Sequence, residues 1–478
     1  MESLAPQDRR TEQKQDGYAD MEDTLREQLV NRKVYRRLMW FLVLLFVCSY
    51  LDRINMSFAA LSMNRELGLS VASFGIASSI FYSAYVLAEI PSNMAMRKVG
   101  ARLWIPRIMI TWGIASCACV FATGPHSLYA LRALVGLAEA GFMPGILLYL
   151  TYWFPDAYRA RASTLFVMAQ PLTILFGSAI SGAILEMDGV LGLSGWRWLF
   201  ILEGIPSVLL GVAALFYLDD RPEDARWLTD EEKRTLRGSL QRDEQAATMQ
   251  AGNVPLPELS TPRQLIQPSL ILLALCYFGL VMSLSANSTW VPQIVRSIAP
   301  DASLFQIGLV TAVPSVIAIV TMAAWGAHSD RHRERVWHVV IPMAVAAPGW
   351  GAVALAQAPL LKFVGLILCS AGTFSAQAIF WSMAPQYLSA SARAVGIAAI
   401  SVVGMLGTAV GPAMIGVLHD ATGSFTAGLS FVALCVSAGA VCVATIRWTH
   451  GSNGGGSRAP SADDAAGAPG RRSAALRR

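Results

Sequence analysis

Charged side chains are scarce in this sequence. Asp, Glu, Lys and Arg make up 14% of its 478 residues, whereas hydrophobic residues make up 54%. A soluble protein usually carries about 25% charged residues. Many separate stretches reach the roughly 20 apolar residues that a membrane-spanning helix needs. The scarcity of charge therefore argues against a soluble globular protein and predicts an all-α, polytopic membrane protein.

Other absences restrict the function. The seven cysteines form no CxxC pair and no Cys/His cluster, so neither a disulfide framework nor a metal site is expected. No Walker motif, HExxH or nucleophile elbow occurs, which speaks against ATP binding and against an enzyme. The net charge of +5 is small and lies in loops and tails, so nucleic acid is not expected as a partner. No cofactor is expected.

Long apolar runs are abundant instead. A polar segment at 219–269 separates six runs from six more, which predicts twelve transmembrane helices in two pseudo-symmetric six-helix halves. The spans are expected near 38–60, 71–95, 103–122, 127–150, 160–186, 198–218, 270–292, 304–325, 338–357, 360–384, 393–416 and 425–447. The predicted domains are a tail at 1–37, a bundle at 38–218, a linker at 219–269, a bundle at 270–447 and a disordered tail at 448–478.

Basic residues are distributed unevenly over the connections between these spans. The segment before the first span and the connections after even-numbered spans carry Arg32, Lys33, Arg36, Arg37, Arg97, Lys98, Arg102, Arg159, Arg161, Arg331, Arg333, Arg335 and Arg393. The other connections hold mostly isolated bases. Loops rich in Lys and Arg stay in the cytoplasm. Both termini and the linker are therefore expected to be cytoplasmic, in a plasma membrane that would be the inner membrane of a bacterium.

Helix signals lie both in the linker and within the spans. Thr229 and Glu232 have the spacing of a capping box, which predicts a surface helix at the start of the linker. Pro171 and Pro412 lie in corresponding spans of the two halves and are expected to bend them. The eleventh span, "GMLGTAVGPAMIG", presents glycines that permit close helix contact.

An acid and a base stand side by side in the first span, in the stretch "CSYLDRINMSFA". A charge inside a bilayer costs a few kcal/mol, so Asp52 and Arg53 each indicate a functional site. Neighbouring residues on a helix diverge by about 100° and cannot share one face. In the fourth span, "LYALRALVGLAEAGFMPG", the residues Arg132, Gly136 and Glu139 have the i, i+4, i+7 spacing of a single face.

These four charged side chains have two interpretations. They form either a structural set of ion pairs between two helices or a hydrated central chamber that binds substrate. A guanidinium binds a carboxylate in a bidentate fork, and carboxyl groups in a low-dielectric cavity exchange protons near neutral pH. The second interpretation predicts a proton-coupled carrier of organic anions, in which all four side chains share the chamber.

Further polar residues inside the spans are weaker candidates. Tyr50, Tyr85, Gln170, Asn287 and Trp381 either shape a binding site or serve packing. Two more acids, Glu89 toward the cytoplasmic end of the second span and Glu203 early in the sixth, are expected to pair with arginines of the loops.

The loop "WGAHSDRHRERVWH" after the eighth span resembles the signature loop of the major facilitator superfamily. The residues that carry the resemblance are Gly326, Asp330, Arg331 and Arg335, and Gly326, Asp330 and Arg331 are the expected gating residues. The matching loop of the first half, "NMAMRKVGAR", keeps Gly100 but has Arg97 where an Asp is usual. The resemblance implies the twelve-helix fold of that superfamily.

Five motifs in order, "YLDRINMSFA", "YVLAEIPSNMAMRKVGAR", "LRALVGLAEAGFMPG", "GWRWLFILEG" and "RPEDARWLTDEE", resemble the anion:cation symporter family within it, and its phthalate and tartrate permeases in particular. The resemblance implies that Arg53 and Arg132 hold a substrate carboxylate and that Asp52 and Glu139 take up protons. It also implies that Tyr50, Tyr85, Gln170 and Trp381 line the site. Ser401 and Met405 stand where many members have Asn, which favours a less polar or aromatic acid over a sugar acid.

The sequence therefore predicts a monomeric secondary transporter that imports a small organic carboxylate together with protons, by alternating access. Three alternatives remain open at this point. The first is another kind of carrier, which is Na⁺-coupled, an exchanger or an exporter. The second is a receptor that senses carboxylates without moving them. The third is a membrane-embedded enzyme.

Overall fold

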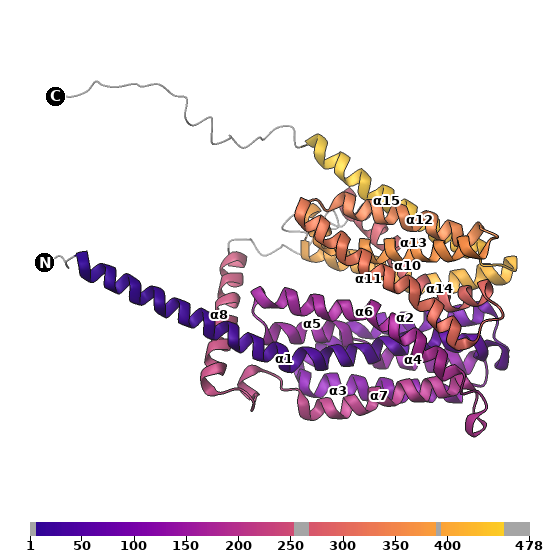
Figure 1. Ribbon diagram of the computed structural model, residues 1–478, viewed down its shortest axis with the longest axis horizontal. Coiled ribbons are helices and arrows are strands. Elements are labelled where there is room, and N and C mark those ends of the chain that lie inside the picture. The colour runs from indigo at the N-terminus through magenta and orange to yellow at the C-terminus, as the bar shows by residue number, and fades with distance from the viewer. Residues whose placement is uncertain (1–5, 253–266, 389–392, 454–478) are drawn as a thin grey trace.

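The computed structural model describes residues 6–252, 267–388 and 393–453, and all regular elements in these ranges are helices. The long helices run side by side, and the start of α1 (Pro6–Glu66) and the end of α15 (Thr426–Asn453) lie at the same end of the molecule (Figure 1). We name this end the terminal end, and the opposite one the far end.

The helices form two groups, drawn in indigo to magenta and in orange to yellow in Figure 1. The first group consists of α1, α2 (Val71–Val99), α3 (Ala101–Ala118), α4 (Pro125–Glu139), α5 (Phe142–Trp153), α6 (Asp156–Leu185) and α7 (Gly195–Tyr217). The second consists of α10 (Pro268–Ile298), α11 (Leu304–His332), α12 (Val336–Leu355), α13 (Pro359–Met383), α14 (Arg393–Thr422) and α15. Short 3₁₀ turns occupy Cys119–Phe121, Val190–Gly192, Pro222–Asp224 and Ala384–Tyr387.

The predicted spans correspond to these helices. Eleven stretches of the described residues are helical, long and apolar enough to cross a membrane. The remaining predicted span, 160–186, lies in α6, a helix of 30 residues with a shorter apolar part at Ala169–Leu185. The all-α polytopic fold is therefore confirmed. The proposed domain boundaries stay a prediction, and the tail at 454–478 and the linker at 253–266 lie outside the described residues.

The fourth predicted span is not one straight helix. It divides into α4 and α5, and the break follows directly after Glu139, the last residue of α4. Gly141 has a left-handed backbone with φ of 86°, and a Cβ there would overlap the side chain of Ser92 in α2. Only glycine fits this position without strain. The break thus places the buried side chain of Glu139 at the end of α4, inside the first group.

A polar clamp lies at the terminal end. The predicted capping box is confirmed: Glu232 Oε2 accepts from Thr229 N at 2.8 Å and Thr229 Oγ1 accepts from Glu232 N at 3.2 Å. The helix that follows, α8 (Asp230–Gly252), packs on α1, which continues as helix far before its apolar part. Three ion pairs join α1 to α8: Lys33–Glu232 at 2.7 Å, Arg26–Glu231 at 2.5 Å and Glu27–Arg242 at 2.8 Å.

The two groups of helices touch closely at the far end. A Cβ on Gly75 of α2 would overlap the carbonyl oxygen of Pro412 in α14, and one on Gly308 of α11 would overlap that of Ser178 in α6. Backbones approach this closely only where a side chain is missing. The seams α2–α14 and α6–α11 therefore close the far end of the molecule.

Two carboxylates reinforce these seams in a matching way. Asp420 Oδ2 at the end of α14 accepts from the N–H of Ala72, the second residue of α2, at 3.1 Å. Glu186 Oε1, directly after α6, accepts from the N–H of Phe305, the second residue of α11, also at 3.1 Å. Each group of helices thus places an acid on a helix N-terminus of the other, where the helix dipole favours negative charge. We name Asp420 and Glu186 the latch acids.

The glycines of the eleventh predicted span serve two different contacts. In α14, Gly404 lies against the ring of Tyr277 and Gly407 against the backbone of Phe278, both in α10. Gly416 instead meets the carbonyl oxygen of Val71 in α2. One helix therefore packs tightly within its own group over part of its length and across the seam at its far end.

Candidate functional site

A cavity of about 280 Å³ lies between the two groups of helices. Its lining comprises Phe46, Ser49, Tyr50, Arg53, Tyr82, Tyr85, Val86, Glu89, Met143, Pro144, Gln170, Tyr277, Val281, Leu284, Ser285, Ser288, Gln377, Ser401, Met405 and Thr408. Sites for small molecules occupy roughly 300–1,000 Å³. A cavity at the lower end of that range suits a small organic molecule rather than a large one.

Arg53 lines the cavity and forms an ion pair with Glu139, which is buried behind it. Arg53 Nε and Nη2 lie 2.9 and 2.8 Å from Glu139 Oε1, and Ser49 Oγ donates to the same oxygen at 3.0 Å. The Glu139 side chain is 1% exposed, whereas that of Arg53 is 23% exposed and reaches the cavity. Oε2 of Glu139 is buried without a hydrogen-bond partner among the described residues. The carboxyl thus keeps one oxygen open for a proton.

Asp52 faces away from the cavity. Trp112 Nε1 and Ser116 Oγ of α3 donate to its carboxylate at 2.6 and 2.7 Å, and Ser207 Oγ of α7 donates at 3.2 Å. Asp52 is 2% exposed and forms no ion pair within the described part of the chain. The divergence of adjacent residues on one helix is confirmed, because Arg53 points into the cavity and Asp52 into the first group of helices.

Arg132 also lies behind the cavity wall. It is 4% exposed, its guanidinium carbon lies 4.4 Å from the ring centre of Phe81, and Arg53 lies 5.9 Å from the same ring. Gly136, one turn further along α4, brings the backbone of that helix against the carbonyl of Phe81. The prediction of one chamber shared by all four charged side chains is therefore corrected. In this conformation Arg53 lines the cavity, and Glu139 is connected to the cavity through its ion pair with Arg53.

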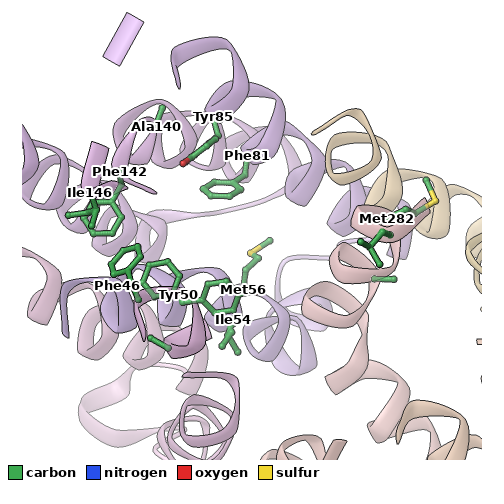
Figure 2. Close-up of a cluster of buried hydrophobic side chains, with 14 of the residues drawn as sticks. Phe46, Tyr50, Ile54, Met56, Phe81, Tyr85, Ala140, Phe142, Ile146 and Met282 are labelled. Atoms are coloured by element: carbon green, nitrogen blue, oxygen red, sulfur yellow. The ribbon is translucent and has the colours of Figure 1, made fainter. Parts of the chain in front are cut away.

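The structure brings together the three residues of the first group that the sequence predicts to line the site, Tyr50, Tyr85 and Gln170. Gln170 Nε2 of α6 donates to the hydroxyl of Tyr50 at 2.6 Å, and the Tyr85 ring lies 5.2 Å from the guanidinium carbon of Arg53. Figure 2 shows Tyr85 of α2 beside Phe81 and Tyr50 of α1 beside Phe46. An aromatic ring beside a guanidinium stabilises the cation and keeps it in place. These three predicted residues all line the cavity.

The second group contributes neutral side chains. Ser285, Ser288, Gln377 and Thr408 supply hydroxyl and amide groups, and no basic residue of this group is among the described lining. Ser401 and Met405 also line the cavity, as expected of residues that affect substrate choice. Trp381 lies one layer further out, where its Nε1 donates to the hydroxyl of Tyr277 at 3.3 Å. It supports the wall through Tyr277 instead of facing the cavity itself.

The predicted gating residues lie in the last turns of α11 at the terminal end, before the short connection to α12. Asp330 of α11 pairs with Arg335, the residue before α12, at 2.7 Å, and Arg335 also donates to Ser329 Oγ at 2.9 Å. Arg331 is exposed, and a Cβ on Gly326 would meet nothing within 4 Å. No hydrogen bond or ion pair joins these residues to the first group in the part of the chain that the structure describes. A gating role stays a prediction that concerns another conformation.

Two acids differ from their predicted surroundings. Glu89 lines the cavity, and no loop arginine pairs with it among the described residues. Glu203 is 4% exposed and accepts from Ser181 Oγ at 2.7 Å, so it too lies in the interior. The sequence contains a signal that Glu89 lies in the cavity, since Glu89 follows Tyr85 by one helical turn and therefore shares its face of the helix.

Comparison with known proteins defines the class of this chain. The profile of the Major Facilitator Superfamily matches residues 42–412. The chain belongs to the major facilitator superfamily of membrane transporters. The predicted superfamily is therefore confirmed, and the chain is a transporter and not an enzyme.

The relatives and a solved structure agree with this assignment. Two proteins of Agrobacterium vitis, provisionally named tartrate transporters, are 44% and 46% identical; the matches cover 90% and 85% of this chain and 97% and 89% of those proteins. A solved structure of a bacterial homologue of the human lysosomal transporter Spinster, inward-facing and unoccupied, has a TM-score of 0.66 at 16% identity. That match covers 87% of this chain and 95% of that chain, and it shows the shared fold.

Proposed function

We propose that this protein is a monomeric, proton-coupled importer of small organic carboxylates in the plasma membrane, the inner membrane of a bacterium. The observation that carries the proposal is the Arg53–Glu139 ion pair on the wall of the central cavity. A permanent cation that faces the cavity is matched to an anionic substrate. The buried carboxyl of Glu139, which pairs with this cation, provides the link to protons.

The proposed cycle follows from competition for one guanidinium. Protonation of Glu139 removes the charge that holds Arg53, which frees the guanidinium for the substrate carboxylate. Asp52 is a second proton site within the first group of helices, and Arg132 supports the positive potential behind Phe81. When Glu139 loses its proton, the ion pair forms again and displaces the substrate.

The orientation follows from the basic loops. If both termini are cytoplasmic, the far end faces the outside, and the closed seams make this an inward-facing conformation. Opening of the far end and closure of the terminal end would then alternate around the fixed cavity. The gating residues Gly326, Asp330 and Arg331 would act when the terminal end closes.

Membrane energetics favour the coupling. A monoanion that enters a cell with a negative interior costs about 2.3 kcal/mol per 100 mV. One proton cancels that charge, and a second makes the inward movement favourable. Two proton sites, Glu139 and Asp52, therefore suffice to drive accumulation of a monoanion by both the pH gradient and the membrane potential.

Small hydroxy acids and aromatic acids are the first substrates to test. The relatives that are named for tartrate favour the former, and the ring-rich wall with Ser401 and Met405 favours the latter. Because binding stabilises only the folded state, the acid that the cavity accepts should raise the unfolding temperature in detergent. The panel contains tartrate, phthalate, benzoate, gluconate and succinate.

Uptake of radiolabelled tartrate into liposomes tests the proposed function. We expect accumulation when the outside is more acidic than the inside, loss of accumulation with a protonophore, and no change when choline replaces Na⁺. Accumulation without a gradient would contradict the proposal. So would full accumulation by the variant with both Asp52→Asn and Glu139→Gln, with tartrate exchange at equal pH as the control for its folding.

A further inference from the structure

Glu89 is an acid inside the cavity for which the proposed cycle has no task. It lies on α2, 18 residues after the first residue of that helix, and lines the same cavity as Arg53. In the described part of the chain its carboxylate has no ion pair within 4 Å, and only its backbone oxygen accepts a hydrogen bond, from Asn93 Nδ2. A carboxyl that lines a substrate cavity and forms no ion pair within 4 Å among the described residues requires an explanation.

The position of Glu89 relative to Arg53 is set by α2. Tyr85 lies 5.2 Å from the Arg53 guanidinium carbon, and Glu89 follows Tyr85 by one turn of about 5.4 Å on the same face. The turn leads away from the sealed far end and toward the terminal end. Glu89 therefore lies between the ion pair and the terminal end of the molecule.

Glu139 needs such a neighbour. Its side chain is 1% exposed, and its free oxygen Oε2 is buried, so it has no direct access to solution in this conformation. A proton on Glu139 must therefore pass to another group before it can leave the protein. Among the described lining, Glu89 is the carboxyl that faces the cavity.

The groups around Glu89 do not offer a rival carboxyl. The titratable side chains that face the cavity from the packed helices are Tyr50 and Arg53 of α1, Tyr82 and Tyr85 of α2, and Tyr277 of α10. The lining residues of α5, α6, α13 and α14 contribute no ionisable group; they are Met143, Pro144, Gln170, Gln377, Ser401, Met405 and Thr408. Tyrosine hydroxyls do not ionise near neutral pH, and arginine stays charged.

We infer that Glu89 is the proton-release group of the transport cycle: it accepts the proton that leaves Glu139 and passes it to the solution at the terminal end. The inference rests on the proposed function. The proton balance is simple. The Glu139 carboxyl becomes a carboxylate and pairs again with Arg53, Glu89 gains that proton, and Glu89 then returns to a carboxylate as the proton enters the water. The recovered charge of Glu89 also repels the departing anion.

The test follows protons and substrate separately in liposomes that contain the full chain and a pH-sensitive dye. Tartrate in an acidic outer medium should acidify the lumen in the wild type. With Glu89→Gln, which keeps the shape but cannot carry a proton, we expect acidification and net uptake to slow by about tenfold or more. Tartrate exchange at equal pH needs no net proton movement and should stay close to the wild-type rate. Glu89→Asp should restore much of the acidification.

Each outcome decides between the two proposals. If Glu89→Gln acidifies the lumen as fast as the wild type, this inference is overturned and the proposed function stands. If exchange is lost together with net uptake while the variant keeps its unfolding temperature, Glu89 is a substrate contact and not a proton-release group. If the wild type takes up tartrate without any acidification, or takes up none of the five acids of the panel, the proposed function fails and the inference falls with it.

Discussion

At the scale of single residues, two neighbours in the sequence lie in different chemical environments. Asp52 and Arg53 are neighbours, yet Asp52 is held by Trp112 and Ser116, whereas Arg53 reaches the cavity and pairs with Glu139. The sequence predicted that the two side chains diverge. It did not predict which of them faces the cavity, because both lie in equally apolar surroundings and the partners come from α3 and α4, far along the chain.

The planar guanidinium of Arg53 should be essential for substrate affinity. Arg53→Lys keeps the charge but loses the planar set of donors that matches a carboxylate. Hydrogen bonds between charged groups contribute about 1.5–3 kcal/mol, so the affinity for tartrate should fall roughly 10- to 100-fold. Tracer binding to the purified protein measures it, with Arg107→Lys on α3 as the control. Wild-type affinity in Arg53→Lys would show that the substrate does not contact this guanidinium.

At the scale of elements, backbone contacts close the seams between the two groups at the far end, whereas side-chain ion pairs join α1 to α8 at the terminal end. The capping box of α8 and the apolar length of the spans were readable from the sequence, because they depend on neighbouring residues only. The break between α4 and α5 was not, since it depends on the fit of Gly141 against Ser92 of another helix. The matched latch acids were also missed, because each needs a helix N-terminus of the other group.

The seam glycines should tolerate no side chain. A methyl group on Gly75 or Gly308 would overlap a carbonyl oxygen of the opposite group, and such overpacking costs about 1–3 kcal/mol. Gly75→Ala and Gly308→Ala should therefore favour the conformation with an open far end. A cysteine at Ser79, which lies on the seam at 8% exposed, should then react faster with a water-soluble thiol reagent.

The control for the seam glycines is Gly351→Ala in α12, where a Cβ would meet nothing within 4 Å. It should leave both transport and the labelling of the cysteine at Ser79 unchanged. Equal labelling rates in all three glycine variants would contradict the assignment of these seams as the closed gate.

The latch acids should stabilise the closed far end by their charge. The double variant with Asp420→Asn and Glu186→Gln keeps the size of both side chains but removes two charges from helix N-termini, each worth about 0.3–1 kcal/mol. Spin labels at Val190 and Asp301, on opposite groups at the far end, should then report a larger share of long distances. An unchanged distance distribution would show that the two hydrogen bonds do not hold the gate.

The clamp between α1 and α8 should loosen in acid. Burial raises the pKa of Glu232, but the hydrogen bonds from Lys33 and Thr229 outweigh burial and hold the pKa below its usual range. A carboxyl with a lowered folded-state pKa stabilises the folded contact above its unfolded pKa of about 4.3, and this contribution is lost as the pH falls through the folded value. Fluorescence energy transfer between labels on α1 and α8 should therefore weaken below about pH 4.3.

Glu232→Gln serves as the control for the clamp. It should shift or remove the acid transition, and it should show slightly weaker transfer at neutral pH. The effect is small, because an exposed ion pair contributes about 0.2–1 kcal/mol. A transition of the same size and midpoint in Glu232→Gln would assign it to other groups.

At the scale of the whole molecule, the fold and the class were predictable from the sequence because hydropathy, loop charge and short motifs are local signals. The arrangement of the site was predictable in part. Tyr50, Tyr85 and Gln170 line the cavity as expected, whereas Arg132 and Asp52 lie behind its wall. Burial depth depends on which neighbouring helix covers a residue, and one sequence does not carry that information. We therefore propose that Arg53 contacts the substrate and that Glu139 carries the proton.

The affinity for tartrate as a function of pH tests this central assignment most directly. Purified wild-type protein should bind weakly at pH 7.5 and more tightly as the pH falls, since protonation of Glu139 releases Arg53. Glu139→Gln should bind about tenfold more tightly than the wild type at pH 7.5, which corresponds to roughly 1.4 kcal/mol. Weaker or equal binding by Glu139→Gln at pH 7.5 would contradict the claim that Glu139 and the substrate compete for one guanidinium.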